Sequence, residues 1–211
     1  MKAFIENLSN IYKIEINNFK LLIKNRPIVE CSTSNEDCLF LYLLVKFFKP
    51  TNILEIGTFV GSTLFAIITA CEENKSPYTI HTIDNNDALK LEKNLLHSVK
   101  IHKGWSATVL KNINTTFDFV FSDANLDKET AVILENLITN NTVFATHDFV
   151  PPYDKGISSV FNMIQYTRLK DNILIMPDHK CNWIYEYKSY QNMHEKFSEN
   201  YVKNTTFEIN R

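Results

Sequence analysis

Glu55-Ile56-Gly57-Thr58-Phe59-Val60-Gly61 is the stretch that decides the fold, because two glycines follow directly on the short β-rich run Asn52 to Ile56. The chain contains only four glycines, so the positions of these two are informative. Gly57 permits a tight turn with unusual backbone angles, and Gly61 lets the main chain approach a ligand closely where a helix begins. Such a loop at the carboxyl end of a parallel strand predicts a ligand-binding edge.

Short β-rich runs alternate with amphipathic runs from about residue 52 onward, which is typical of βαβ units. The expected strands are Asn52 to Ile56, Tyr78 to Ile83, Val99 to His102, Phe117 to Ser122, Thr142 to Thr146, Asn172 to Met176 and Asn182 to Tyr187. The expected helices are Ser62 to Glu72, Asp87 to Leu96, Ser106 to Lys111, Lys128 to Thr139 and Lys155 to Thr167. We therefore predict an α/β fold with a doubly wound, mostly parallel, seven-stranded sheet. The last two strands are too close in sequence for a helix between them, so we expect a hairpin and an antiparallel last strand.

The length of 211 residues and the absence of a linker predict one domain over residues 1–211. Residues 1–50 form an N-terminal helical segment in this prediction, with a helix from Asp37 to Phe48 and an ambiguous stretch before it. Residues 51–188 form the core sheet, and apolar side chains at helical spacing predict a C-terminal helix or tail in residues 189–211. These terminal elements are also candidates for a homodimer interface.

The composition favours a cytoplasmic protein that acts on small molecules. A formal net charge of -2 leaves no basic excess for binding a nucleic acid. The longest apolar run, Cys38 to Val45, is too short to span a bilayer, and the N-terminus does not have the pattern of a signal peptide. The four cysteines show no metal-binding spacing, so we expect buried thiols.

The chemistry around the loop indicates which ligand it binds. A dinucleotide site would show G-x-G-x-x-G, whereas this loop reads G-x-x-x-G with Glu55 two residues before the first glycine. A carboxylate here suits a ligand with an ammonium and a sulfonium group, which points to S-adenosylmethionine (SAM) rather than to NAD. Asp84 ends the second strand, where a carboxylate can accept hydrogen bonds from ribose hydroxyls, and Gly104-Trp105-Ser106 follows the third strand.

These features resemble the class I SAM-dependent methyltransferases, because Leu54 to Ser62 is similar to motif I of their O-methyltransferase branch. The resemblance covers about residues 36 to 188 and implies a Rossmann-like methyltransferase fold with SAM as cofactor. It implies three groups of cofactor contacts: Glu55, Gly57, Thr58, Gly61 and Ser62 around the methionine part, Asp84 at the ribose, and Gly104, Trp105 and Ser106 around the adenine.

The acceptor side is expected at the ends of the fourth and fifth strands. Asp123 stands where catechol-type O-methyltransferases carry a metal-binding aspartate that also borders the cofactor, but the fifth strand ends in His147-Asp148 where those enzymes have Asp-Asn. This pair is more similar to a group of small bacterial methyltransferases. The catalytic lysine of the catechol-type enzymes would fall at Leu126, unless Lys128 replaces it.

Two mechanisms remain open at this edge. Asp123, His147 and Asp148 could hold Mg²⁺ or another divalent cation that binds a hydroxyl acceptor. Alternatively His147 is a general base oriented by Asp148 or Asp123. In both versions we expect methyl transfer to a hydroxyl of a small metabolite, a sugar or a phenol, with Tyr153 as a wall of the acceptor pocket.

The alternatives are an N-methyltransferase acting on a small amine, a dehydrogenase on a dinucleotide fold, and a protein that binds SAM or a nucleoside without catalysis.

Overall fold

The computed structural model describes residues 8, 10–30, 32–147, 162, 163, 165–168, 173–175 and 185–187, the last two stretches as backbone only. Asp148, Tyr153, most of the predicted helix Lys155 to Thr167 and the predicted C-terminal helix lie outside the described residues. All other candidate site residues from the sequence lie within them.

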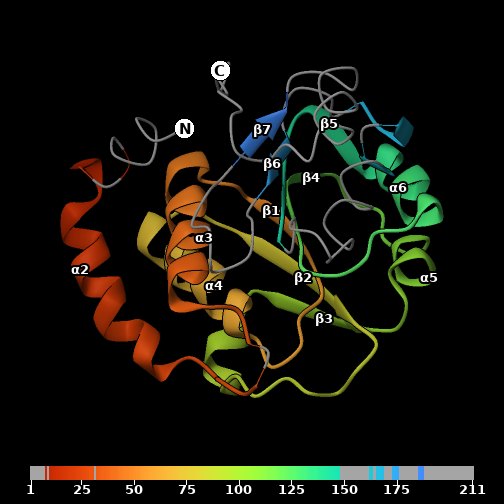
Figure 1. Ribbon diagram of the computed structural model, residues 1–211. Coiled ribbons are helices and arrows are strands. Elements are labelled where there is room, and N and C mark those ends of the chain that lie inside the picture. Colours follow the sequence, from red (N-terminus) through yellow and green to blue (C-terminus); the bar gives the residue numbers. More distant parts are fainter. Residues whose placement is uncertain are drawn as a thin grey trace.

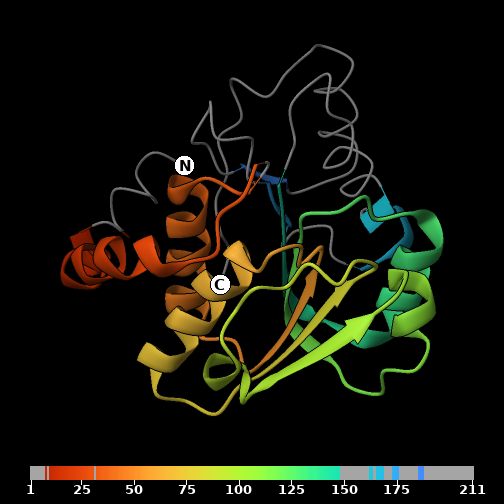
Figure 2. The same ribbon diagram turned by 90° about the horizontal axis from the view of Figure 1, so that it is seen from below.

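A parallel sheet of five strands forms the centre of the molecule (Figures 1 and 2). The strands are β1 (Asn52–Ile56), β2 (Thr79–Asp84), β3 (Val99–Lys103), β4 (Phe117–Ser122) and β5 (Ile138–Thr146), in the spatial order β3-β2-β1-β4-β5. The order reverses between β1 and β4, which is the switch point where such sheets bind ligands. This confirms the predicted α/β class and its parallel core.

Two short strands continue the order beyond β5. β6 (Ile173–Ile175) pairs parallel with β5, and β7 (Tyr185–Tyr187) pairs antiparallel with β6. The connection between β6 and β7 lies outside the described residues, so the complete seven-stranded fold stays a prediction.

Helices cover both faces of the sheet, as a doubly wound fold requires (Figure 1). α3 (Asn35–Phe48) and α4 (Ser62–Asn74) pack on one face, and α5 (Ser106–Leu110), α6 (Lys128–Leu134) and the 3₁₀ turn η3 (Glu135–Leu137) lie on the other. Adjacent residues of one strand serve opposite cores, since Ile53 packs toward α3 and α4 whereas Leu54 packs toward α5 and α6. Burial on both faces explains the continuous apolar runs of β1 and β4.

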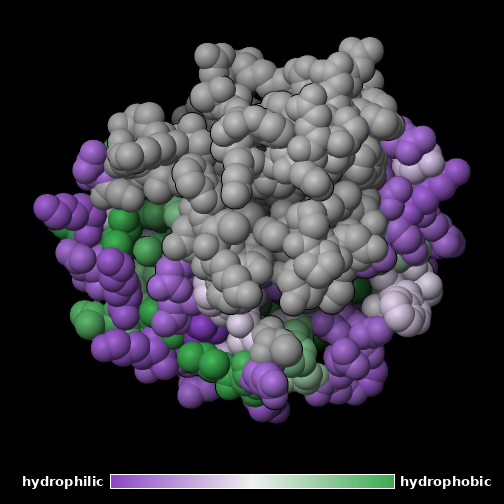
Figure 3. Space-filling model, in the orientation of Figure 1, coloured by the Kyte–Doolittle hydropathy of each residue, from purple (hydrophilic) through white to green (hydrophobic). Residues whose placement is uncertain are grey.

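The N-terminal segment is helical. α2 (Lys13–Leu22) continues into the 3₁₀ turn η1 (Ile23–Asn25) and lies outside α3 (Figure 1). The residues Ile14 and Ile16, which alternate like those of a strand, are part of this helix. Ile16 and Phe19 are buried against the body, whereas Ile11, Ile14 and Leu21 are exposed, and hydrophobic side chains interrupt the hydrophilic surface on this side (Figure 3). The homodimer stays a prediction.

The predicted helix from Asp87 to Leu96 is wrong. Only the last four residues form a 3₁₀ turn, η2 (Lys93–Leu96), and the backbone N–H of Lys90 donates to the carbonyl of Val60 at 3.1 Å. Leu89 and Leu91, which are two residues apart, both pack against Gly61. In a helix, side chains two residues apart point in different directions, so a helix could not make both contacts. The predicted helix Lys128 to Thr139 is also too long, because β5 begins at Ile138.

No helix in the described part of the chain is both long enough and apolar enough to cross a membrane.

Asp118 in β4 fixes the beginning of β1, the strand that carries the glycine loop. Its Oδ2 accepts a hydrogen bond from the backbone N–H of Thr51 at 2.8 Å, and its Oδ1 accepts one from the backbone N–H of Asn52 at 3.0 Å. Both donors precede or open the strand, where the ladder does not yet satisfy them. One carboxylate thus secures the register of β1 beside β4.

We expect Asp118→Ala to lower the free energy of unfolding by about 1–3 kcal/mol, because two backbone donors lose their acceptor. Asp118→Asn keeps one acceptor oxygen and should cost less. Urea unfolding followed by circular dichroism measures both. Asp87→Ala is the control, since Asp87 forms an exposed ion pair with Lys103 that contributes little. Equal losses for Asp87→Ala and Asp118→Ala would refute this role.

Candidate functional site

The loop after β1 takes the tight turn predicted for it. Gly57 has φ +95°, and a Cβ atom there would lie 3.0 Å from the backbone carbonyl carbon and oxygen of Asp123. Gly61 has φ +93° and is the N-cap of α4, and its missing Cβ would lie 2.7 Å from the side chain of Leu89. A side chain at either position would be strained in its backbone and would displace a neighbour. The two glycines therefore bring three segments of chain together at the carboxyl edge of the sheet.

Glu55 lies fully buried beneath this loop. Its carboxylate accepts hydrogen bonds from the hydroxyl of Thr63 at 2.7 Å and from the hydroxyl of Thr82, which also contacts Thr58. The sequence interpretation places this carboxylate beside the ligand, whereas in the structure it ties β1 to α4 and β2. Its contact with a cofactor stays a prediction.

Burial raises the pKa of Glu55 to about 7. The hydrogen bonds from Thr82 and Thr63 oppose this rise in the pKa, and the carboxylates of Asp123 and Asp84 add to it. Glu55 therefore takes up a proton near neutral pH, where an ordinary glutamate is ionised.

Asp84 connects the glycine loop to the ends of β2 and β3. Its Oδ2 accepts a hydrogen bond from the backbone N–H of Phe59 at 2.7 Å, and its backbone carbonyl accepts one from Gly104 at 2.9 Å. The Trp105 side chain is 72% exposed beside this edge, whereas the hydroxyl of Ser106 lies 3.0 Å from that of Thr130. The structure thus brings Asp84, Gly104 and Trp105 to the same edge and turns Ser106 toward α6.

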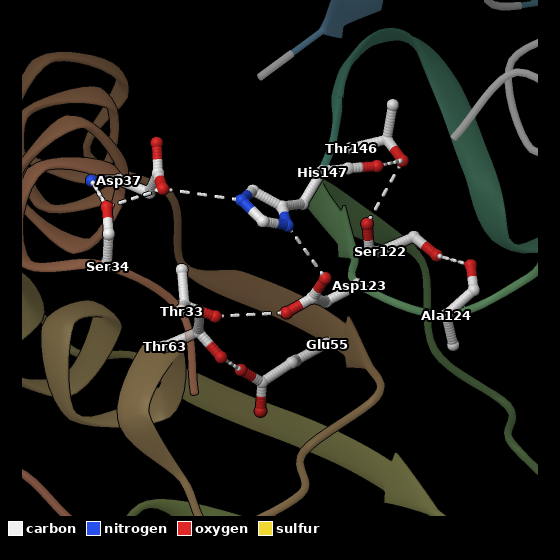
Figure 4. A network of polar contacts seen from close by, with 10 residues as sticks. All are labelled: Thr33, Ser34, Asp37, Glu55, Thr63, Ser122, Asp123, Ala124, Thr146 and His147. Atoms are coloured by element: carbon white, nitrogen blue, oxygen red, sulfur yellow. Dashed lines mark hydrogen bonds and ion pairs between the residues drawn. The ribbon is translucent and has the colours of Figure 1, made fainter. Parts of the chain in front are cut away.

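Asp123 and His147 meet at the ends of β4 and β5 (Figure 4). Asp123 Oδ1 lies 3.1 Å from His147 Nδ1, and Asp123 Oδ2 accepts a hydrogen bond from the hydroxyl of Thr33 at 3.1 Å. The other ring nitrogen, Nε2, faces Asp37 Oδ2 at 3.4 Å. His147 is therefore held between two carboxylates, and only the Asp123 side chain of the three is substantially exposed, at 21% against 8% for His147 and 2% for Asp37.

Within the described residues, Asp123 and His147 do not form a metal site. A metal ion needs converging lone pairs, but both ring nitrogens of His147 are directed at carboxylate oxygens within the protein. No group of three histidine, cysteine or carboxylate side chains within the described residues could hold a metal ion. Asp148, the third ligand predicted from the sequence, lies outside those residues. We therefore derive no step through a metal.

The position expected for a catalytic lysine is structural in this chain. Leu126 is fully buried in the core between the sheet and α6. The neighbouring Lys128 places its ammonium 4.9 Å from the ring centre of Tyr166, a cation–π contact. Neither residue takes part in the cluster around Asp123.

Thr33 and Asp37 are site residues that the sequence analysis does not identify. The pattern Ser34-Asn35-Glu36-Asp37 predicts a helix start, and Ser34 does cap α3 by accepting from the backbone N–H of Asp37 at 3.1 Å. The hydroxyl of Ser34 also donates to Asp37 Oδ2 at 2.6 Å, and this local role explains the aspartate without reference to a site. The contact of Asp37 with His147 spans 110 residues of sequence. Only a three-dimensional arrangement could reveal it.

Residues 54–149, just under half of the chain, match the family model of a methyltransferase domain. The match begins within β1 and ends just after His147, so it covers Asp123 and His147 but not Thr33 and Asp37. This region is similar to a methyltransferase domain, in agreement with the resemblance predicted from the sequence. A comparison with curated proteins finds no match.

The fold is similar to that of solved methyltransferases. The O-methyltransferase TomG from Streptomyces achromogenes, involved in tomaymycin synthesis and solved in complex with SAM, is 20% identical, with a TM-score of 0.51 over 72% of this chain and 74% of TomG. The methyltransferase PaMTH1 from Podospora anserina is also 20% identical, with a TM-score of 0.49 over 61% of this chain. This chain covers only 59% of the fungal protein.

Glu55 should make the stability of the protein depend on pH. Its pKa rises from 4.5 to about 7 on folding, so the folded state binds the proton more tightly than the unfolded state. The resulting stabilisation is complete below pH 4.5 and is lost as the pH rises through about 7. The loss should reach at most about 3 kcal/mol. We expect the free energy of unfolding of the wild type, relative to Glu55→Gln, to fall between pH 5 and 8. A difference that stays constant over this range would contradict the assignment.

Proposed function

We propose that this chain, whose residues 54–149 match the family model of a methyltransferase domain, binds SAM at the carboxyl edge of β1 to β3 and transfers a methyl group to a hydroxyl of a small metabolite. The observation that carries the proposal is the meeting of two groups of residues at Gly57. The glycine loop and Asp84 lie on one side of it, and the Asp123–His147 pair lies on the other. A cofactor site and an acceptor site are thereby adjacent at the switch point of the sheet.

The residues fit SAM in shape and charge. Gly57 and Gly61 keep the loop close to the sheet, Asp84 offers a carboxylate at the end of β2, and α4 begins at Gly61 without a side-chain cap on its backbone N–H groups. The edge is rich in carboxylates, which suits a ligand with sulfonium and ammonium charges. A pyrophosphate would meet repulsion in the same place.

Methyl transfer requires that the acceptor hydroxyl is aligned with the methyl group of the cofactor and that it loses its proton. When bound, SAM supplies a methyl group on a sulfonium, which an oxygen nucleophile attacks in line. Asp123 is the exposed member of its cluster, so we place its carboxylate against the acceptor hydroxyl as the proton acceptor. His147 holds the carboxylate through Nδ1, and Asp37 holds His147 in turn. The known chemistry of TomG, an O-methyltransferase, supports a hydroxyl acceptor.

The same proposal includes the complete fold. A seven-stranded sheet with β7 as its antiparallel last strand is supported by the pairing of β6 with β7. Asp148 and Tyr153, which follow β5 in the sequence, stay predicted residues of the acceptor side.

We expect isothermal titration calorimetry to show binding of SAM and of S-adenosylhomocysteine to the wild type, and no binding of NAD. Tritiated SAM should then label a hydroxyl in a panel of catechols, simple phenols and hexoses. Binding of NAD without SAM would favour the dehydrogenase, and labelling of amines alone would favour an N-methyltransferase. SAM binding without transfer to either class would support a non-catalytic role.

Asp123→Asn and Asp84→Asn should separate the two halves of the site. With the best acceptor of the panel, Asp123→Asn should lower kcat by roughly 100-fold, because an amide cannot take the hydroxyl proton. Asp84→Asn should instead raise the Kd of SAM by about tenfold through its weaker bond to the ribose. Steady-state kinetics and calorimetry measure the two effects. Asp127→Asn, at the exposed cap of α6, is the control. A loss of kcat that is the same for Asp84→Asn and Asp123→Asn would contradict this division.

A further inference from the structure

Arg26 is a buried cation with an unused hydrogen-bond donor. Only 7% of the residue is exposed, and its Nε donates to Asn35 Oδ1 at 3.1 Å. Its Nη1 atom is buried without a hydrogen-bond partner, and no carboxylate in the described part of the chain forms an ion pair with it. The other buried cation of that part, Lys46, is paired with Glu73. Burying a guanidinium donor without a partner has a high free-energy cost, and binding of an anion to Arg26 would offset that cost.

Arg26 lies beside the N-terminus of α4. The carbonyl of Pro27, the next residue, accepts a hydrogen bond from the hydroxyl of Ser62 at 2.5 Å. The thiol of Cys38 contacts the carbonyl of Ser62 at 3.6 Å, and the charge of Arg26 opposes the burial that raises the pKa of this thiol to about 12. Arg26, Cys38 and Ser62 are thus neighbours at the first turn of the helix that follows the glycine loop.

This position is where the amino-acid end of the cofactor should lie, an argument that rests on the proposed function. Asp84 at the end of β2 fixes the ribose on the β2 side of Gly57. The methionine part must then extend to the opposite side, toward β4 and the segment 26–37, which borders both Ser62 and Asp123.

A ligand carboxylate at this edge needs a cation beside it, and Arg26 is a buried one. Glu55, Asp84 and Asp123 lie around the glycine loop, and all three would repel a carboxylate when ionised. The guanidinium is planar, always charged and suited to a carboxylate. We propose that Arg26 binds the carboxylate of the methionine part of SAM. Ser62, whose side chain is turned to Pro27, leaves the backbone N–H groups of α4 available to the same anion.

The test compares ligands that differ only in this carboxylate. Calorimetry without acceptor measures the Kd of SAM and of decarboxylated SAM for the wild type and for Arg26→Gln. We expect the wild type to bind SAM at least tenfold more tightly than decarboxylated SAM, and Arg26→Gln to bind both alike. Arg168→Gln is the matched control, because Arg168 pairs with Glu135 at the exposed end of α6. It should keep the wild-type preference.

The outcomes are distinct. Equal binding of SAM and decarboxylated SAM by the wild type overturns the assignment. This outcome does not depend on any variant, so the assignment can be refuted even if Arg26→Gln fails to fold. A preference for SAM that survives in Arg26→Gln overturns it as well. A wild type that binds neither ligand refutes the proposed function itself.

Discussion

The packing of Gly57 against the main chain of Asp123 is the contact on which the arrangement of this sheet edge depends. The backbone N–H of Gly57 donates to Ile83 in β2, and that of Asp123 donates to Ile56 in β1, both at 2.9 Å. The first residue after β1 is therefore hydrogen-bonded to β2, and the first residue after β4 is hydrogen-bonded to β1. Because Gly57 has no Cβ, the β1 loop and the β4 end can touch, and the two halves of the site share one wall.

The electrostatics of this edge follow from how each carboxylate is held. Glu55 is buried, so its high pKa removes much of its charge near neutral pH, whereas Asp84 binds backbone N–H groups and Asp123 faces an imidazole. The negative charge is thereby concentrated where a cationic ligand would pass. Arg26 adds a buried positive charge near the start of α4, and both its charge and that of Asp123 act on the thiol of Cys38.

The predictable parts of the molecule are those with local causes. β1 and β4 match their predicted bounds because both faces of each strand are buried, and α3 follows its Ser34 cap. The helix expected from Asp87 failed because Leu89 and Leu91 pack on Gly61, a tertiary contact that overrides propensity. Asp123 and His147 were found because strand ends converge in any parallel sheet. Asp37 and Arg26 were missed because nothing in their own neighbourhoods indicates the distant groups they face.

The N-terminal segment contacts residues that lie far away in the sequence, and this affects the order in which the site assembles. The groups around the glycine loop lie within the 30 residues from Glu55 to Asp84, whereas Thr33 and Asp123 are 90 residues apart and Asp37 and His147 are 110 apart. Closing such long loops has a high entropic cost before the contacts form. In a chain growing from its N-terminus the contacts around the glycine loop can therefore form first, whereas the contact of Asp37 with His147 forms only after β5 has joined the sheet.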